Sequence, residues 1–423
     1  MSSEKTGNAT RRLDAVVAAS FLATGIVVAS VPRFLRSEFD ATRSQTGLAT
    51  TGFFLAALLF RPFVGRGIER YGRSVFLRWA MLATGILSIG FVFANSIPAI
   101  ATLRILQGAA GAAFYTAALT TATDLAPSDK RAAAVARLSV NVYLGFTIGP
   151  LIADFLIRGP GYKIVWLLII ALYFLGFALS WWVPETGNPQ TRDPRRETPS
   201  SEFPAAENAR TFGEGLTVSL ASTVPSRPSL SQRIREYLPR SAVIPGIAMF
   251  ATALTFSTVT IFTPDYADNM GIARPGMLLA FYAIAVLVVR VVASPIVDRR
   301  NAYVVVLPAM VVAGVALGAM ATSRSAVVSH LAIALAGFGA GATFPALSAM
   351  VVQGVATAKR ATALSAFLMF NDIGQAAAGP IVGLVSDAIG WRWVFGVPAL
   401  ATFIALSVLL VARRQPTPMP SAT

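Results

Sequence analysis

The chain has 423 residues, of which 55% are hydrophobic and 13% charged, and its formal net charge is +15. Soluble domains carry about 25% charged residues, so a water-soluble protein of this length would lack the side chains to cover its surface. Cysteine is absent and His330 is the only histidine. This composition excludes thiol chemistry and disulfides, and it argues against histidine-rich metal sites and a Ser-His-Asp triad.

Twelve long apolar segments follow one another along the chain. A bilayer core about 30 Å thick requires about 20 apolar residues per helix, and backbone groups in lipid must be paired within the segment. The sequence therefore predicts an all-α membrane protein with twelve transmembrane helices in two bundles of six. We expect them near residues 13–34, 46–66, 75–95, 98–123, 131–157 and 163–184, and then near 241–263, 276–297, 302–322, 326–352, 360–385 and 391–413.

One polar stretch, residues 185–240, separates the two sets of segments. It is rich in Pro, Ser, Thr, Glu and Arg and has little apolar periodicity, which is typical of a disordered linker. We expect an N-terminal six-helix bundle over 1–184 and a C-terminal six-helix bundle over 241–423. The linker between them is expected to be cytoplasmic.

The basic residues predict the orientation. Lys and Arg are concentrated in the segments that would lie on the same side as both termini. We expect the protein in the inner (plasma) membrane of the cell. The positive-inside rule then places both termini in the cytoplasm. The net charge therefore reflects topology, and no nucleic acid is expected as a partner.

The two halves resemble each other at an offset of about 229–230 residues. Arg61 matches Arg290, and Asn141 precedes Gly149-Pro150 by the same eight residues that separate Asn371 from Gly379-Pro380. Several such matches in the same order indicate a duplicated six-helix unit. Transporters built from two repeats related by an axis along the membrane normal bind their substrate near the midplane between the repeats.

The loop after the second segment carries the most specific motif. It reads Gly65-Arg-Gly-Ile-Glu-Arg-Tyr-Gly-Arg-Ser74 and resembles the Gly-x-x-x-Asp-Arg-x-Gly-Arg-Arg signature of the major facilitator superfamily, with Glu for Asp and Ser for the last basic residue. By this resemblance Glu69 caps a neighbouring helix end and pairs with an arginine, which latches the outward-facing state. The alternative is simple stop-transfer charge. The resemblance implies a latch of Gly65, Glu69, Arg70, Gly72 and Arg73, with Asp298 and Arg299 as second-half counterparts.

Arg104 stands inside the fourth apolar segment, in the run Arg104-Ile-Leu-Gln-Gly-Ala-Ala-Gly111. The run resembles the superfamily's fourth-helix motif, whose arginine is associated with proton coupling. Gly108 and Gly111 would permit close helix approach. The alternative for Arg104 is snorkelling toward the outer face.

The fifth segment carries Gly145-Phe-Thr-Ile-Gly149-Pro150, which resembles the antiporter signature of the drug-efflux families. The motif is partial, because Ala136 replaces its first Gly and Ala153-Asp154 its closing pair. It implies a kinked, closely packed helix and favours efflux. Gly379-Pro380 repeats the pattern in the second half.

Asp372 is predicted to lie near the bilayer midplane, where an ionised carboxylate is most costly, so we take it as a candidate proton carrier. The alternative is a structural acid paired with Arg104 or Arg290. Residues at the span ends, namely Asp154, Asp265 and Arg290, are expected to be solvated or to snorkel. The polar residues expected in a substrate cavity are Asn141, Tyr115, Tyr143, Asn371 and Gln375.

The chain lacks a Gly-x-x-x-x-Gly-Lys-Ser/Thr motif, so ATP-driven transport is not expected. The sequence predicts a secondary transporter that is not an enzyme and needs no metal or cofactor. We expect a monomer in the lipid bilayer that uses protons to export a small amphipathic drug or metabolite by alternating access. The alternatives are a proton-coupled importer of a small nutrient such as a sugar or organic acid, and a non-transporting membrane receptor or scaffold.

Overall fold

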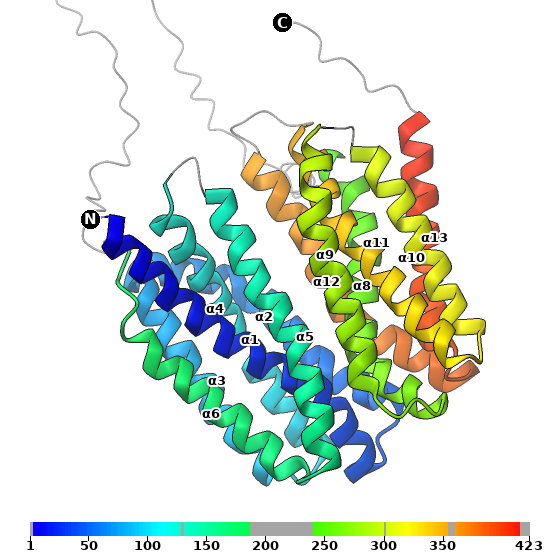
Figure 1. The fold of residues 1–423 in the computed structure, drawn as a ribbon, viewed down its shortest axis with the longest axis horizontal. Helices are drawn as coiled ribbons and strands as arrows, with labels where there is room; N and C mark the ends of the chain where they lie inside the picture. The colour runs from blue at the N-terminus through cyan, green and yellow to red at the C-terminus, as the bar shows by residue number, and fades with distance from the viewer. Residues whose placement is uncertain (1–2, 128–130, 187–239, 300–301, 354–359, 415–423) are drawn as a thin grey trace, which may run out of the picture.

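The computed structural model describes residues 3–127, 131–186, 240–299, 302–353 and 360–414. Twelve helices and no strands occur in these ranges (Figure 1). In chain order they are α1 (Ser3–Phe39), α2 (Arg43–Tyr71), α3 (Arg73–Phe93), α4 (Ile97–Leu125), α5 (Arg131–Arg158), α6 (Tyr162–Ser180), α8 (Arg240–Asn269), α9 (Pro275–Arg299), α10 (Ala302–Thr322), α11 (Ala326–Gln353), α12 (Arg360–Ile389) and α13 (Trp393–Arg414).

The predicted all-α membrane fold is confirmed. Over the described residues, 10 helices are long and apolar enough to cross a membrane. The remaining two of the twelve helices are α2 and α9, in which the side chains of the second half are only partly described. The predicted linker 185–240 lies almost wholly outside the described residues.

The helices form two bundles that repeat the same packing. In the first, α1 packs on α5 and α6, α2 on α4, and α3 on α4 and α6; in the second, α8 packs on α12 and α13, α9 on α11, and α10 on α11 and α13. Each pair in the first bundle therefore has its counterpart in the second. The bundles meet along α2 with α12 and along α5 with α9, which are again counterparts. The structure thus confirms the duplicated unit.

Local sequence explains how apolar spans tolerate their polar residues. Buried hydroxyls bond to the carbonyl one turn earlier in their own helix, as Thr121 does to Ala117 at 2.8 Å and Thr343 to Gly339 at 2.7 Å. At the helix ends, Thr42 and Gln45 form a capping box that begins α2. Many buried hydroxyls are therefore paired without water.

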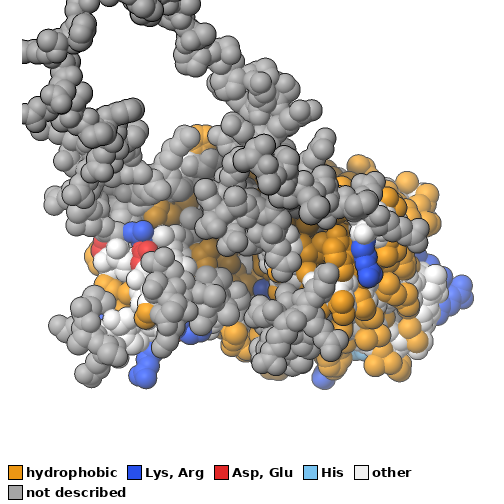
Figure 2. Space-filling view, turned by 90° about the horizontal axis from the view of Figure 1, so that it is seen from above, with side chains coloured by type: hydrophobic (Ala, Val, Ile, Leu, Met, Phe, Trp, Pro, Cys, Tyr) orange, Lys and Arg blue, Asp and Glu red, His pale blue; other side chains and the backbone are white. Residues whose placement is uncertain are grey.

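Large apolar side chains lie on the outside of the bundles. Phe93, Phe155 and Val327 are 77%, 75% and 68% exposed. In Figure 2 the visible surface of the right-hand bundle is largely hydrophobic, with Lys and Arg side chains near its edge. Lipid solvates such a surface, whereas a soluble monomer rarely exposes apolar patches of this extent.

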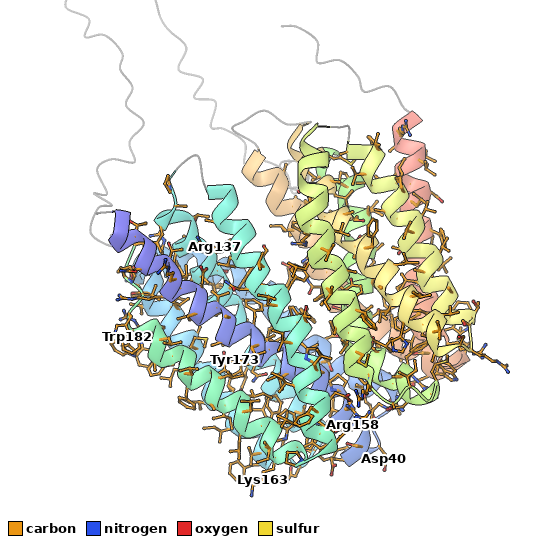
Figure 3. The ribbon with its side chains drawn as sticks, in the orientation of Figure 1. Asp40, Arg137, Arg158, Lys163, Tyr173 and Trp182 are labelled. Carbon is orange, nitrogen blue, oxygen red and sulfur yellow. The ribbon has the colours of Figure 1, made fainter. Side chains whose placement is uncertain are left out.

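The helices alternate in direction, which defines two ends of the molecule. We call the end where α1 begins and α13 ends the terminal face, and the other end the opposite face. Figure 3 shows Asp40, Arg158 and Lys163 at the opposite face and Arg137 near the terminal face. The bundles approach each other at the opposite face and diverge toward the terminal face (Figure 1).

Candidate functional site

Close backbone contacts at glycines hold the opposite face together. A Cβ on Gly379 in α12 would overlap the Gly47 carbonyl of α2. The counterpart contact lies between α9 and α5, where a Cβ on Gly276 would reach the Pro150 carbonyl at 2.7 Å. Each member of the first pair stands 229 residues from its counterpart in the second. The same device thus holds both contacts between the halves.

Ion pairs across the halves reinforce this closure. Asp265 of α8 pairs with Arg36 of α1 and, at 2.6 Å, with Nε of Arg43 at the start of α2. Arg36 and Asp265 are themselves repeat counterparts, so they meet across the pseudo-twofold axis. In addition, the backbone N–H groups of Arg43 and Ser44 donate to the Asp387 carboxylate at 3.1 and 2.8 Å. An acid of one half therefore caps a helix of the other.

Two sequence expectations fail at this face. Asp154 and Asp265 were expected to be solvated, but they are only 7% and 2% exposed. Asp154 instead pairs with Arg33 at 2.8 Å and with Arg158 at 3.3 Å. The reason is tertiary, because residues at a span end are buried when two bundles close over them. A cavity of about 410 Å³ at this face is lined in part by the paired residues Arg33, Arg36, Arg43 and Asp265.

The terminal face has a different pattern, because the ion pairs among its described residues join helices of the first bundle. Arg73 pairs with Asp124 at 2.6 Å, and Arg137 with Asp14 at 3.0 Å. Glu185 caps α3, since it accepts bonds from the N–H groups of Arg73 and Ser74 at 2.8 and 2.9 Å. These contacts stabilise one half and do not hold the two halves together.

The predicted latch falls in this region. Gly72 ends α2 with a φ of +99°, a conformation that glycine adopts without strain, and a Cβ there would lie 2.7 Å from the Glu185 carboxylate. Arg70 is exposed over the ring of Tyr71. The side chains of Glu69, Asp298 and Arg299, and the surroundings of Gly65, lie outside the described part of the structure. The latch therefore stays a prediction.

Arg104 lies inside the first bundle and is only 2% exposed. Its guanidinium donates to Gln107 at 3.1 Å and lies 4.5 Å from the centre of the Phe53 ring. Gln107 in turn donates to Ser88 of α3 at 3.1 Å. The alternative of snorkelling is thus wrong for Arg104. Among the described residues its partners are an amide and a ring, so its charge is not cancelled by a carboxylate there.

The predicted packing glycines lie at close helix approaches. A Cβ on Gly108 would overlap the backbone of Phe53, and one on Gly145 the backbone of Phe21. The second half repeats both contacts at an offset of 229, between Gly337 and Tyr282 and between Gly374 and Phe250. Gly111 abuts the Phe53 ring, and Gly149 abuts Gly25.

Aromatic rings fill the interface between the halves. Phe146 of α5 and Phe256 of α8 meet edge to face at 5.5 Å, and Phe256 approaches Tyr282 of α9 at 6.4 Å. Phe21 continues the chain of rings on the first-bundle side, 6.2 Å from Phe146 and 5.9 Å from Tyr115. The pocket lined by Tyr143, Phe146, Phe256 and Tyr282 has a volume of about 10 Å³, so these rings nearly fill the interface, and we call them the aromatic plug.

Arg290 sits on the terminal-face side of this plug, contrary to the expectation that it snorkels. Its guanidinium lies 4.6 Å from the ring centre of Tyr143 in the other half and 5.1 Å from that of Phe344. The contact of Arg290 with the other half was not predicted from the sequence. The signal was present in the pairing of Arg290 with Arg61 in the repeat, which marks a cation retained in both halves.

The other predicted site residues lie on α4, α5 and α12. Asp372 is 7% exposed and accepts a bond from the amide of Asn371 at 3.2 Å. Tyr143 lines the interface pocket, whereas Asn141, Asn371 and Gln375 are half-buried and stand outside that pocket's lining. The matching contacts of Gly145 and Gly374 align α5 with α12 at an offset of 229, one residue less than the Gly-Pro pairs suggest, and this alignment places Asp372 where α5 has Tyr143.

These features define a class of protein. Twelve helices in two repeated bundles, with a polar and aromatic interface between them, form the architecture of a secondary transporter. The family model of the Major Facilitator Superfamily matches residues 13–379 and 331–423, and the chain belongs to this superfamily. The prediction that it is a transporter and not an enzyme is confirmed.

Individual relatives are distant. The chain is 23% identical over 404 residues to the staphylopine export protein of Staphylococcus aureus, with 91% of each chain covered. It is 27% identical over 384 residues to a gallate transporter of Pseudomonas putida, with 88% of this chain and 84% of the relative covered. Its fold is similar to the crystal structure of a bacterial homolog of the human lysosomal transporter Spinster in an inward-facing, unoccupied conformation, with a TM-score of 0.76, 15% identity, and 99% and 100% coverage.

Proposed function

We propose that the protein exports a small amphipathic drug or metabolite in exchange for protons by alternating access. The observation that carries this proposal is the interface itself. An aromatic plug lies between two repeated halves, and among the described residues the ion pairs that join the halves lie at the opposite face. When the seal at the opposite face opens and the terminal face closes, a compound resting on the plug is released on the other side.

We assign the proton to Asp372. A buried carboxylate within a membrane span is costly when ionised, so changes in its surroundings between two states favour uptake or release of a proton. Asp372 occupies the repeat position of Tyr143, whose ring lies against the other half. Arg104 is proposed to assist as a buried positive charge whose field depends on the packing of α3 and α4.

We propose further that both termini lie in the cytoplasm and that the protein acts as a monomer in the plasma membrane. The distribution of Lys and Arg supports the orientation, and it makes the terminal face the cytoplasmic one. Both halves of the site come from one chain, so a single copy suffices. The latch at Gly65 to Arg73 is proposed to close the terminal face in the other state. Fusion of a reporter active only outside the cytoplasm to the C-terminus should give no signal.

The relatives and the partial antiporter motif bear on direction. The staphylopine export protein of S. aureus supports export. The second candidate is proton-coupled import of an organic acid, which is favoured by the cation Arg290 at the interface and by the gallate transporter of P. putida. The two candidates differ in whether substrate and protons move in opposite directions or in the same one.

The test uses proteoliposomes that contain a fluorescent pH indicator and receive an outward or inward gradient of a panel of anionic, neutral and cationic amphipaths. Export by exchange predicts proton movement opposite to the compound, and Asp372→Asn should reduce it at least tenfold. Asp40→Asn serves as the control, because Asp40 is an exposed carboxylate in the α1–α2 turn. Movement in the same direction would establish the import alternative, and an unimpaired Asp372→Asn variant would refute the proton assignment.

A further inference from the structure

Arg290 is a cation at the contact between the two halves, and its described protein contacts leave one of its hydrogen-bond donors without a partner. The side chain is half-buried, and its Nε is buried with no hydrogen-bond partner among the described residues. Its described contacts are the faces of Tyr143 and Phe344. Contacts with ring faces leave the N–H groups of a guanidinium, which point outward in its plane, available for hydrogen bonds. The two rings therefore hold the cation in place, and its Nε–H has no hydrogen-bond partner among the described residues.

The residue opposite Arg290 is a phenol where the repeat would supply an acid. Asp372 stands at the position in α12 that Tyr143 has in α5, and Tyr143 is the residue that faces Arg290. No ion pair joins Arg290 to a carboxylate among the residues whose side chains are described. A buried cation without an anionic partner is costly, and an anion supplied by a ligand removes that cost.

The surroundings of Arg290 define the rest of the ligand. Tyr143, Phe146 and Phe256 line the pocket that adjoins it. Tyr282 lines the same pocket, is 3% exposed, and has a hydroxyl without a hydrogen-bond partner. The site therefore combines one cation, one buried hydroxyl donor and several ring faces. Rings favour a flat apolar body, and a guanidinium favours a planar carboxylate that accepts two bonds.

We infer that Arg290 is the specificity-determining residue for substrate, and that the substrate is an organic anion with an aromatic or flat apolar body. The anionic group rests on Arg290 at the terminal-face side of the plug, and the body packs against Tyr143. The Phe146–Phe256 contact must then open for the ligand to pass or to settle deeper. This inference rests on the proposed transport function, whichever way transport runs.

Binding is tested with purified full-length protein in detergent by ligand-induced thermal stabilisation, followed by intrinsic tryptophan fluorescence. The probes are benzoate, 2-naphthoate and 2-naphthalenesulfonate, each compared with its neutral amide. A ligand that binds only the folded protein raises the unfolding temperature according to its concentration and affinity. We expect at least one anion to bind about tenfold or more tightly than its amide.

Substitutions locate the effect. Arg290→Gln should abolish the preference for the anion, and Arg290→Lys should retain part of it because the charge remains. Arg392→Gln is the matched control, since Arg392 also lies over a ring, that of Trp391 at 5.4 Å, but outside the interface. Should Arg290→Gln unfold, the comparison of Arg290→Lys with Arg392→Gln decides in its place. Tyr143→Phe should leave the preference intact, because the ring is retained.

The inference is overturned when no anion in the panel is preferred to its amide, or when Arg290 and Arg392 variants lose the preference equally. The outcomes also separate it from the transport proposal. Anion preference that depends on Arg290 without coupled flux in proteoliposomes would remove the transport proposal and keep the binding site. Coupled flux of neutral or cationic compounds that is unaffected by Arg290→Gln would do the reverse.

Discussion

The two faces of the protein use charge in different ways. At the opposite face, Arg36 and Arg43 of the first half hold Asp265 and Asp387 of the second. At the terminal face, the described pairs such as Arg73 with Asp124 stay within one half. Contacts that cross between halves must break when the transporter changes state, whereas contacts inside a half need not. The comparison therefore separates residues that set the conformational equilibrium from residues that stabilise a bundle.

Accessibility of residue 46 reports on this comparison. Thr46 is 1% exposed, adjoins the opposite-face cavity, and the natural chain has no cysteine. A Thr46→Cys substitution thus introduces a single thiol, whose rate of reaction with a maleimide in detergent measures how often the opposite face opens.

The largest effect is expected for Gly379→Leu. Its side chain would overlap the Gly47 carbonyl and Thr51, and overpacking of this kind costs about 1–3 kcal/mol. The conformation with a closed opposite face should become less stable, so maleimide labelling of Thr46→Cys should accelerate about tenfold to a hundredfold. Gly318→Leu is the matched control, because a Cβ at Gly318 meets nothing within 4 Å. Equal labelling of both variants would show that the glycine contact does not hold the face closed.

A smaller effect is expected for Asp265→Asn. It leaves two arginines facing an amide, but they remain 32% and 20% exposed, so solvent reduces the cost to about 1 kcal/mol. Labelling should accelerate about fivefold. In a double-mutant cycle, Arg36→Gln should increase the labelling rate less in the Asp265→Asn background than in the otherwise unchanged protein. Glu38→Gln, an exposed cavity residue, is the control. Full additivity would contradict a direct pair.

The smallest effect on the equilibrium is expected for Asp124→Asn. The Arg73–Asp124 pair is about a quarter exposed and lies within the first half, so its loss should cost at most about 1 kcal/mol of bundle stability. We expect a small decrease in unfolding temperature and no change in maleimide labelling. Faster labelling in this variant would mean that the two faces do not differ in the way described.

Much of the fold follows from the sequence because lipid imposes strict requirements on it. Helix number and order were predicted, and boundaries differ by a few residues, except that α1 begins at Ser3 instead of near residue 13. The polar residues before Leu13 continue the helix, since helix formation does not require an apolar sequence. The packing glycines were likewise visible, because small residues spaced along a span permit backbone contact.

The partners of the charged residues were not predictable in the same way. Arg36 and Asp265 stand 229 residues apart, and nothing local marks them as a pair. Arg290 was expected to snorkel toward the membrane surface. The position of a residue along a span gives its depth in the bilayer, but not the side of the helix on which it lies. In a membrane helix the lipid-facing and protein-facing sides are both apolar, so periodicity does not distinguish them.

The sequence by itself determined that the chain spans a membrane twelve times, that its two halves are copies, and to which superfamily it belongs. Only the tertiary structure decided which face is closed, which acids close it, and that Arg290 lies against two rings with its Nε unpaired among the described residues. The physical reason is that hydropathy acts on each helix separately, whereas ion pairs and ring contacts depend on how two bundles are placed against each other.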